Sequence, residues 1–518
     1  MLKIIRYILL FGPGFVWAQQ PKDSLARQQA PDPALYYTDS VLRMQLDFAR
    51  SAAYYLPSLM PQKASSAGIA YYREQGAFRA AQQASTRNEG QFYTEGSTLL
   101  GNLRLYGGLR YQRILEDSTA FAHQTRSNPT TPFYYGSPAN VHYDRTRYTF
   151  DAMAAKSFLA ERFELGLATQ YTVGSHYSTN DPRGAIREFQ FDLNGTLAYH
   201  LSAAAKIGIG YRHGYGRESV NIGYKNPRYY ESSAFPVYYN HLVNGYREWD
   251  DALKLRVYDN TMQRDALKAY VDLHHPALGD IYLNGSYQKE KQHYFYSSST
   301  GFVPYADYFP ETFTIHGLWL KSLRTIAIGA QVGFQRIAGK DFNVNFKANN
   351  YLYTGKQSDF KFFIQQKSEK KQQYYALGLL QYSEERQDGI SGNHVFYNQL
   401  YLSGTYSLQY TAAKGQTLGF GLEAGWQIPA KASFDVVPDE GYFTQYVINR
   451  DYLYHTASAL SAGIRAAYGF PLPGTLKPEL AIAWRYQNKL DEKTVPYIVN
   501  VQPGNTRFYS TIQFNLYF

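Results

Sequence analysis

Residues 417–427 read TLGFGLEAGWQ, and this stretch alternates strictly between two kinds of side chain. Leu, Phe, Leu, Ala and Trp occupy the even positions, while the odd positions hold Thr, Gly, Glu and Gln. Successive side chains of a β-strand point to opposite faces of a sheet. The pattern therefore predicts a strand with one apolar face and one small or polar face.

The same alternation returns along most of the chain after residue 66. It is found at 163–173, 189–199, 206–215, 281–288, 326–335, 399–410 and 479–487. These segments match the tilted strands of membrane barrels in length and exceed the usual strands of soluble proteins. Their polar faces are richer in Gly, Ser, Thr and Gln than in Lys and Glu, which disfavours a soluble β-sandwich. We expect an all-β fold, a transmembrane antiparallel up-and-down β-barrel of about 16 strands, with 14–18 compatible with the pattern.

The composition excludes several other classes of protein. Of 518 residues, 17% are aromatic, including 51 Tyr, and none is Cys. A helical membrane protein needs apolar runs of about 20 residues, and none follows residue 18. Without Cys there is no disulfide, thiolate metal site or thiol catalysis. The net charge of +10 is spread along the chain with no basic run, so we expect no nucleic-acid partner.

The first 66 residues differ from the rest of the chain. Lys3 and Arg6, the apolar run 8–16 and the small Ala18 predict a signal peptide over 1–18, so the mature chain would start at Gln19. Residues 19–66 are predicted to form an N-terminal segment, periplasmic or inside the barrel, with a short helix within 36–57 capped by Asp39 or Ser40. The barrel is then expected over 67–518.

Connections between the predicted strands fall into short and long groups. Short ones lie at 160–162, 201–205, 276–279 and 412–416, and long ones at roughly 114–143, 217–261, 290–311, 428–453 and 490–506. Outer-membrane barrels have short periplasmic turns and long extracellular loops. The long group is therefore expected at the cell surface of a Gram-negative bacterium.

The last strand carries a second export signal. Phe514, Leu516 and Phe518 alternate with polar or Tyr positions and end the chain. This arrangement resembles the C-terminal β-signal that the barrel-assembly machinery reads. We expect that machinery and outer-membrane lipid as partners.

Several short motifs resemble a family of Bacteroidota outer-membrane barrels of uncharacterised function. They are Gly76-Ala77-Phe78-Arg79 with Gln82, Phe92-Tyr93-Thr94-Glu95-Gly96, Leu105-Tyr106-Gly107-Gly108 with Tyr111, and Asn180-Asp181-Pro182-Arg183. The resemblance implies the fold and the location, and no functional residue. A fainter similarity is to long-chain fatty-acid transporters, where residues 51–55 stand in the place of an internal N-terminal segment but lack the Asn-Pro-Ala pattern.

The alternation assigns nine charged residues to the lumen. They are Arg104, Arg110, Glu164, Asp192, Lys206, Arg212, Glu423, Arg465 and Arg485. One interpretation is a charged constriction that selects polar or anionic solutes. The other is a network of ion pairs that fills and stiffens the barrel.

Aromatic residues mark the longest loop as a candidate binding surface. Its tyrosines and tryptophan include Tyr229, Tyr230, Tyr238, Tyr239 and Trp249. Such side chains give large and rigid contact areas at interfaces. The alternative is that the loop only folds over the barrel mouth.

We therefore expect a channel or accessory pore for small polar solutes, which could be one subunit of a larger envelope complex. The alternative is a scaffold or surface-binding barrel. A TonB-dependent transporter would need a plug domain far larger than residues 19–66. We expect no cofactor, no metal and no enzymatic activity, because His-Glu-x-x-His and Gly-x-Ser-x-Gly motifs are absent. The lumen could be open, plugged by residues 19–66 or closed by loops.

Overall fold

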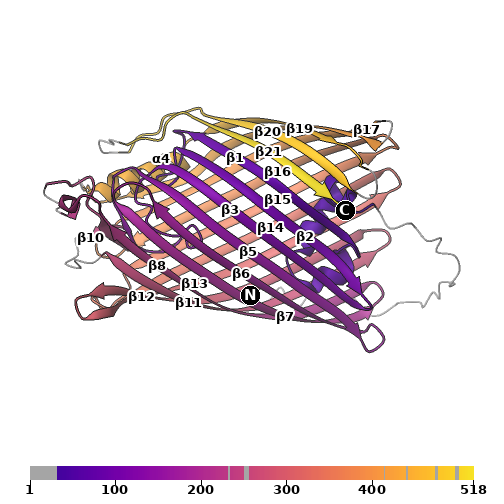
Figure 1. The fold of residues 1–518 in the computed structure, drawn as a ribbon, viewed down its shortest axis with the longest axis horizontal. Coiled ribbons are helices and arrows are strands. Elements are labelled where there is room, and N and C mark those ends of the chain that lie inside the picture. The colour runs from indigo at the N-terminus through magenta and orange to yellow at the C-terminus, as the bar shows by residue number, and fades with distance from the viewer. Residues whose placement is uncertain are drawn as a thin grey trace. The chain divides into compact units, whose positions relative to one another are not determined.

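A closed antiparallel sheet forms the wall of the protein (Figure 1). The computed structural model describes residues 32–230, 234–249, 256–412, 415–438, 441–472, 476–495 and 501–518. Within these residues, 18 strands pair in chain order, each antiparallel to its neighbours. The last strand, β21 (Thr506–Tyr517), pairs with the first, β1 (Ala64–Gly76), and this pairing closes the barrel.

The other elements have the following bounds. The barrel continues through β2 (Thr86–Leu100), β3 (Leu103–Thr119), β5 (Val141–Phe158), β6 (Phe163–Ser178), β7 (Arg183–Ser202), β8 (Ala205–Gly223), β11 (Val257–His275), β12 (Gly279–Ser298), β13 (Gly301–Leu323), β14 (Ile326–Asn343), β15 (Tyr351–Lys367), β16 (Lys371–Asp388), β17 (His394–Thr411), β18 (Thr417–Asp435), β19 (Ala459–Gly469) and β20 (Lys477–Lys489). A small sheet contains β4 (Phe133–Gly136), β9 (His241–Asn244) and β10 (Glu248–Trp249). The helical elements are α1 (Leu35–Thr38), α2 (Ser40–Ala49), η2 (Ala53–Tyr55), α3 (Leu56–Leu59), η3 (Pro227–Tyr230), the π-helical turn η5 (Thr444–Ile448) and α4 (Asn449–His455).

The outer face of the barrel is apolar. Leu377 on β16 is 68% exposed, and the outward residues of β18 include Leu418, Phe420 and Leu422. In lipid, every backbone polar group must find a partner within the protein, and a closed barrel achieves this without an edge. The chain is therefore an outer-membrane β-barrel, as the alternation predicts, and its strand number lies at the upper end of the expected range. No helix in the described residues combines the length and the apolar character that a membrane span requires.

The expectation of a long loop at 290–311 is wrong. β12 continues to Ser298 and β13 starts at Gly301, so only a tight turn separates them. Tyr294 and Tyr296 of this hairpin are buried inside the barrel. Aromatic and polar side chains occupy both faces here, which hides the alternation, and a bulge between Tyr294 and Phe295 shifts the register.

The predicted short turns lie at one end of the barrel, and the other predicted long loops lie at the opposite end, as expected. The four predicted short turns each join neighbouring strands, at 159–162, 203–204, 276–278 and 412–416. Long connections at 120–140, 224–256, 436–458 and 490–505 lie at the opposite end. Since short turns are periplasmic and long loops extracellular in such barrels, the second end faces the cell exterior.

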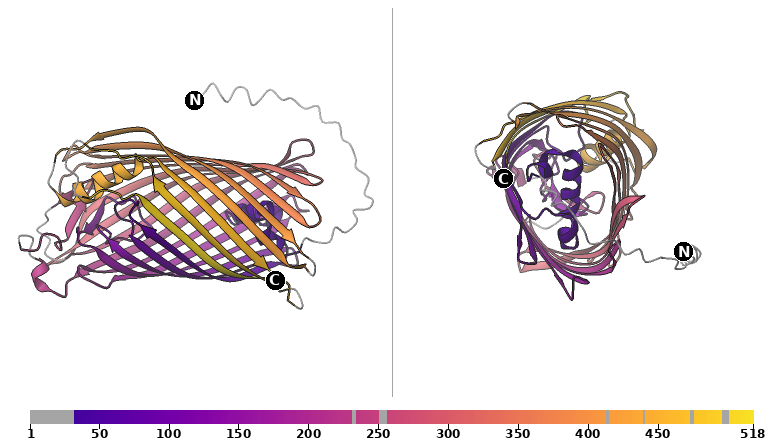
Figure 2. Two further views of the ribbon diagram at one scale, coloured as in Figure 1. Left: turned by 90° about the horizontal axis from the view of Figure 1, so that it is seen from above. Right: turned by 90° about the vertical axis from the view of Figure 1, so that its right-hand side faces the viewer.

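The N-terminal segment lies within the ring of strands, where Figure 2 shows its indigo helices seen along the barrel. We call residues 33–63 the plug, with an arm (35–49) and an anchor (52–60). Helix α2 starts where the sequence predicts, because the Asp39 carboxylate accepts hydrogen bonds from the backbone N–H groups of Val41 (2.9 Å) and Leu42 (3.0 Å). The predicted signal peptide, residues 1–18, lies outside the described residues.

The outer face supplies the first testable prediction. Leu377→Arg places a charge on the lipid side of β16 and should destabilise the folded barrel by about 2–4 kcal/mol if the position is near the bilayer centre. Denaturant unfolding in lipid vesicles, followed by tryptophan fluorescence, measures the change. The control is Thr405→Arg, which lies on the inward face beside Glu423. Equal losses from both variants would contradict the assignment of the two faces.

Candidate functional site

The anchor is buried against the inner wall. Ala53, Tyr55 and Leu56 are fully buried, and Tyr54 is 2% exposed. The Tyr54 hydroxyl donates to the Lys206 carbonyl (3.0 Å), and the Tyr55 hydroxyl donates to a carbonyl of β12 (2.8 Å). These contacts join the anchor to strands on one side of the barrel.

A buried group of charges fixes the anchor electrostatically. The ammonium of Lys206 lies 3.2 Å from the Glu164 carboxylate and 3.2 Å from the Asp272 carboxylate. It also donates to the Tyr54 carbonyl (3.1 Å), while the Ser58 hydroxyl donates to Asp272 (3.2 Å). Two carboxylates of the wall and one backbone carbonyl of the plug therefore surround the buried Lys206 ammonium. The plug is thus a direct partner in this group of charges.

The wall is shaped to receive the anchor. A Cβ atom at Gly208 would lie 2.5 Å from the Tyr54 ring, and one at Gly166 would lie 2.9 Å from Ala53. Such distances are too short for ordinary contact. Gly208 therefore leaves space that the anchor fills, while a Cβ at Gly166 would overlap both Ala53 and the Thr196 hydroxyl of the neighbouring strand.

The arm is held by fewer contacts. Besides capping α2, Asp39 accepts a charged hydrogen bond from Lys367 (2.5 Å) and one from Gln372 (3.1 Å), both at the β15–β16 turn. The Tyr37 ring stacks on Tyr517 at 5.1 Å between centroids. At the other end of the arm, Arg50 pairs with Glu95 of β2.

Three cavities follow one another between the arm and the wall. The first, of about 340 Å³, lies at the periplasmic mouth near Lys367, and the second is only about 90 Å³. The third, of about 460 Å³, lies deeper, and we call it the chamber. Glu479 borders all three, and Arg465 borders the second and third. The smallest of these three cavities therefore lies beside Arg465 and Glu479.

Four of the predicted lumenal charges form ion pairs, in which Glu164, Lys206 and Asp192 are buried and Arg212 is partly buried. Glu164 pairs with Lys206 in the anchor group, and Asp192 pairs with Arg212 at 2.6 Å. Arg104 donates to the carbonyl of Met60 in the anchor (2.8 Å). On this side of the barrel, the charges fill the lumen and support the plug.

The remaining predicted charges meet water. Glu423 and Arg485 approach to 3.9 Å, and Arg465 lies 3.9 Å from Glu479. The side chains of Glu423, Arg465 and Arg485 are 42%, 46% and 40% exposed although they lie on inward faces. Arg110 lines the chamber. The ion-pair network predicted from the sequence therefore describes one side of the lumen, and the exposed charges expected of a constriction lie on the other side.

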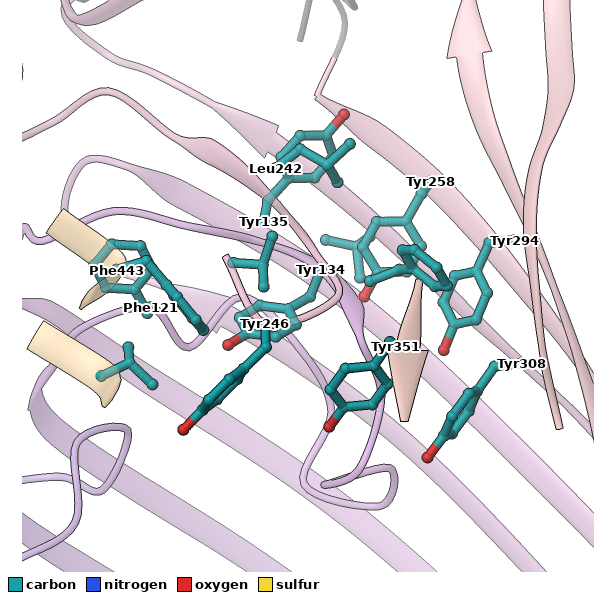
Figure 3. Packing of buried hydrophobic residues seen from close by; sticks show 14 of the residues in the cluster. Phe121, Tyr134, Tyr135, Leu242, Tyr246, Tyr258, Tyr294, Tyr308, Tyr351 and Phe443 are labelled. Carbon is teal, nitrogen blue, oxygen red and sulfur yellow. The ribbon is translucent and has the colours of Figure 1, made fainter. Parts of the chain in front are cut away.

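An aromatic cap fills the extracellular end, and Figure 3 shows its packing. Loop residues such as Phe121, Tyr135 and Leu242 pack against inward tyrosines of the wall. The wall contributes Tyr258, Tyr294, Tyr296, Tyr305, Tyr308, Tyr351, Tyr353 and Tyr397. Much of the Tyr content therefore lies inside the barrel.

Two carboxylates tie the cap loops together. Glu248 accepts the backbone N–H groups of Tyr442 (3.0 Å) and Phe443 (2.9 Å), where the helical part of loop 436–458 begins. Asp451, in α4, accepts the N–H of Ala81 in the β1–β2 loop (2.8 Å). Burial raises the pKa of Asp451 to about 6. Burial lowers the pKa of His455 to about 4, so this histidine is neutral at pH 7.

The candidate binding tyrosines pack against one another. Tyr229 stacks on Tyr238 at 4.0 Å between centroids, and the Arg256 guanidinium lies 4.6 Å from the Tyr239 ring centre. Of these tyrosines only Tyr230 is largely exposed, at 42%. The Trp249 side chain lies outside the described part of the chain.

At the C-terminus, Phe514 and Phe518 face outward on the closing strand, and Leu516 lies between them on the same face. The sequence did not single out Asp272 as a partner of Lys206, nor Arg43 and Glu95 in the chamber. The alternation of side chains along β11 could have placed Asp272 on the inward face. The pairing of β8 with β11, which sets Asp272 beside Lys206, cannot be read from one sequence.

The chain matches one family model and resembles several solved structures. A model of a family described as "Family of unknown function (DUF6850)" matches residues 52–518. No curated protein matches. Among solved structures, the copper transporter OprC has a TM-score of 0.38 at 7% identity, covering 88% of this chain and 80% of its own. The outer membrane transporter YddB from Escherichia coli scores 0.37 at 10% identity, with 88% and 80% covered. The ferric citrate transporter FecA scores 0.40 at 10% identity, with 88% and 79% covered.

The anchor group yields a second prediction. Lys206→Met leaves Glu164 and Asp272 buried without their cation, which should weaken the anchored state by about 3–5 kcal/mol. Hydrogen–deuterium exchange at residues 52–60 should accelerate. Lys289→Met is the control, because Lys289 faces outward with 66% of its side chain exposed. Unchanged exchange in Lys206→Met would show that the ion group does not hold the anchor.

The glycine recess yields a third prediction. Gly208→Val overlaps the Tyr54 ring and should cost about 1–3 kcal/mol, with faster proteolysis of the plug. Gly195→Val is matched to it, since nothing lies within 4 Å of a Cβ at Gly195. Adding Tyr54→Ala should restore part of the loss. If the two valine variants behave alike, the recess is not specific for Tyr54.

Proposed function

We propose, for a chain that belongs to this family of unknown function, that the barrel is a gated outer-membrane channel for small polar solutes. In this proposal the arm is the periplasmic gate and the cap is the extracellular gate. The observation that carries it is the row of polar cavities between the arm and the wall, which runs from the β15–β16 turn past β17–β21 to the inner face of β1–β6. No catalytic role is part of the proposal.

The size of the barrel supports a conducting lumen. Barrels of about 8 strands are filled by their own side chains, whereas those of 16–18 strands leave an aqueous space. Here the space is partly filled by the plug and partly wet, as the exposed inward side chains of Glu423 and Arg485 indicate. Polar groups that line water in a lumen select solutes by charge and diameter.

The unequal attachment of the plug supports gating by the arm. The anchor is buried in a recess and held by the Lys206 group. The first part of the arm contacts the wall through Asp39, which pairs with Lys367 and Gln372, and through one stacked pair of rings, whereas Leu46, Phe48 and Ala49 at its end are buried with the anchor. The Lys367 side chain is 47% exposed, so water competes for its ammonium, although Asp39 itself is buried. The first part of the arm, around Asp39, is therefore expected to leave the wall more readily than the anchor.

Planar-bilayer recording tests this proposal. Lys367→Met releases the arm and Glu248→Ala releases the cap helix, so the double variant should open far more often than the wild type. Removal of residues 33–60 in the Glu248→Ala background should give a persistently open channel. Lys370→Met, in the same turn as Lys367, is the control and should not change the opening frequency. Silence of both the double variant and the plug-deleted barrel would exclude a channel.

A further inference from the structure

We infer that the chamber binds a small organic carboxylate between the arm and the wall. This inference rests on the proposed function, because it names the class of solute for the same lumen. It concerns a cavity of about 460 Å³, within the range of about 300–1,000 Å³ that is usual for sites of small molecules.

The chamber has more cationic than anionic groups. Four arginines line it, Arg43, Arg50, Arg110 and Arg465, together with Glu95, Asp151 and Glu479. Arg50 is neutralised by Glu95, and Arg465 lies near Glu479. Asp151 accepts a hydrogen bond from the amide of Gln170 (2.7 Å). One net positive charge remains among these seven side chains.

Two of the arginines have open donor groups. In the part of the chain that the structure describes, the side chains of Arg43 and Arg110 make no hydrogen bond or ion pair, and both are exposed within the lumen. A guanidinium presents its N–H groups as a planar fork that matches a carboxylate in two parallel hydrogen bonds. The chamber thus offers two unused forks to a ligand.

The position of these forks makes the site bipartite. Arg43 belongs to helix α2 of the arm, and Arg110 belongs to β3 of the wall. A ligand held by both would bridge the movable and the fixed side of the gate. Its binding energy would therefore depend on the position of the arm.

The rest of the lining favours an organic ligand over a bare inorganic ion. Five tyrosines border the chamber: Tyr37, Tyr72, Tyr93, Tyr106 and Tyr517. Their rings provide apolar contact for a carbon skeleton. The hydroxyls of Tyr93, Tyr106 and Tyr517 already donate to Asn515, Glu95 and Glu479, so these tyrosines serve a ligand mainly through their rings. A single phosphate would leave most of this volume and ring surface without contact.

Calorimetric titration of the full chain in detergent tests the inference, with glucuronate and succinate as probes. At least one should bind, and glucose, which lacks the carboxylate, should bind at least 10-fold more weakly. Arg43→Gln and Arg110→Gln should each weaken binding by 10-fold or more. Arg110→Lys should restore part of the loss, because it keeps the charge and removes the fork.

Arg73→Gln is the matched control, since Arg73 lies on the outer face of β1 and should not affect binding. Absence of binding by both carboxylates, or an equal loss in Arg73→Gln, would overturn the inference. Inorganic phosphate that binds as tightly as the organic probes would reduce the site to a general oxyanion site and also overturn it. Circular dichroism and unchanged heat resistance of each variant exclude misfolding as the cause.

The binding experiment is independent of conduction. It is made at equilibrium on the closed barrel, so a chain that conducts without binding would retain the channel proposal and lose this inference. A chain that binds the carboxylate but conducts in no variant would retain this inference and lose the channel proposal.

Discussion

Closure of the sheet is the constraint on which the rest of the structure depends. In lipid, an unpaired strand edge would leave backbone N–H and C=O groups without partners, and the pairing of β1 with β21 removes that edge. Closure at 18 strands sets a circumference too wide for wall side chains to fill. The interior must then be occupied by other parts of the chain or by water, and here it contains both.

Burial of charge follows from this division. Where the plug excludes water, each ionic group needs a partner nearby, and Lys206 has two carboxylates and a carbonyl within 3.2 Å. Where water remains, Glu423 and Arg485 stay at 3.9 Å and keep much of their surface exposed. Charged groups are therefore closely paired where water is excluded and more widely spaced where they are exposed. The lumen is closely packed on the side of Lys206 and solvent-exposed on the side of Glu423 and Arg485.

The period of two was enough to predict the barrel, its inward charges and the four short turns, because a membrane wall imposes opposite chemistry on its two faces. Asp39 could be identified as a helix cap because capping is local. The partner of Lys206 could not be identified, because Asp272 becomes its neighbour only through the register of β8 and β11. The inward tyrosines of β12 and β13 were also missed, since aromatic and polar side chains occupy both faces there and a bulge shifts the register between Tyr294 and Phe295.

The carboxylate of Asp39 serves the arm in two ways at once. One oxygen accepts the N–H groups that begin helix α2, while the other meets Lys367. Separation from the wall removes only the second set of contacts, so the helix keeps its first turn. The beginning of the helix can then move away from Lys367 without unravelling, and its return requires no refolding. A helix end that is already capped makes and breaks its contact with the wall at little entropic cost.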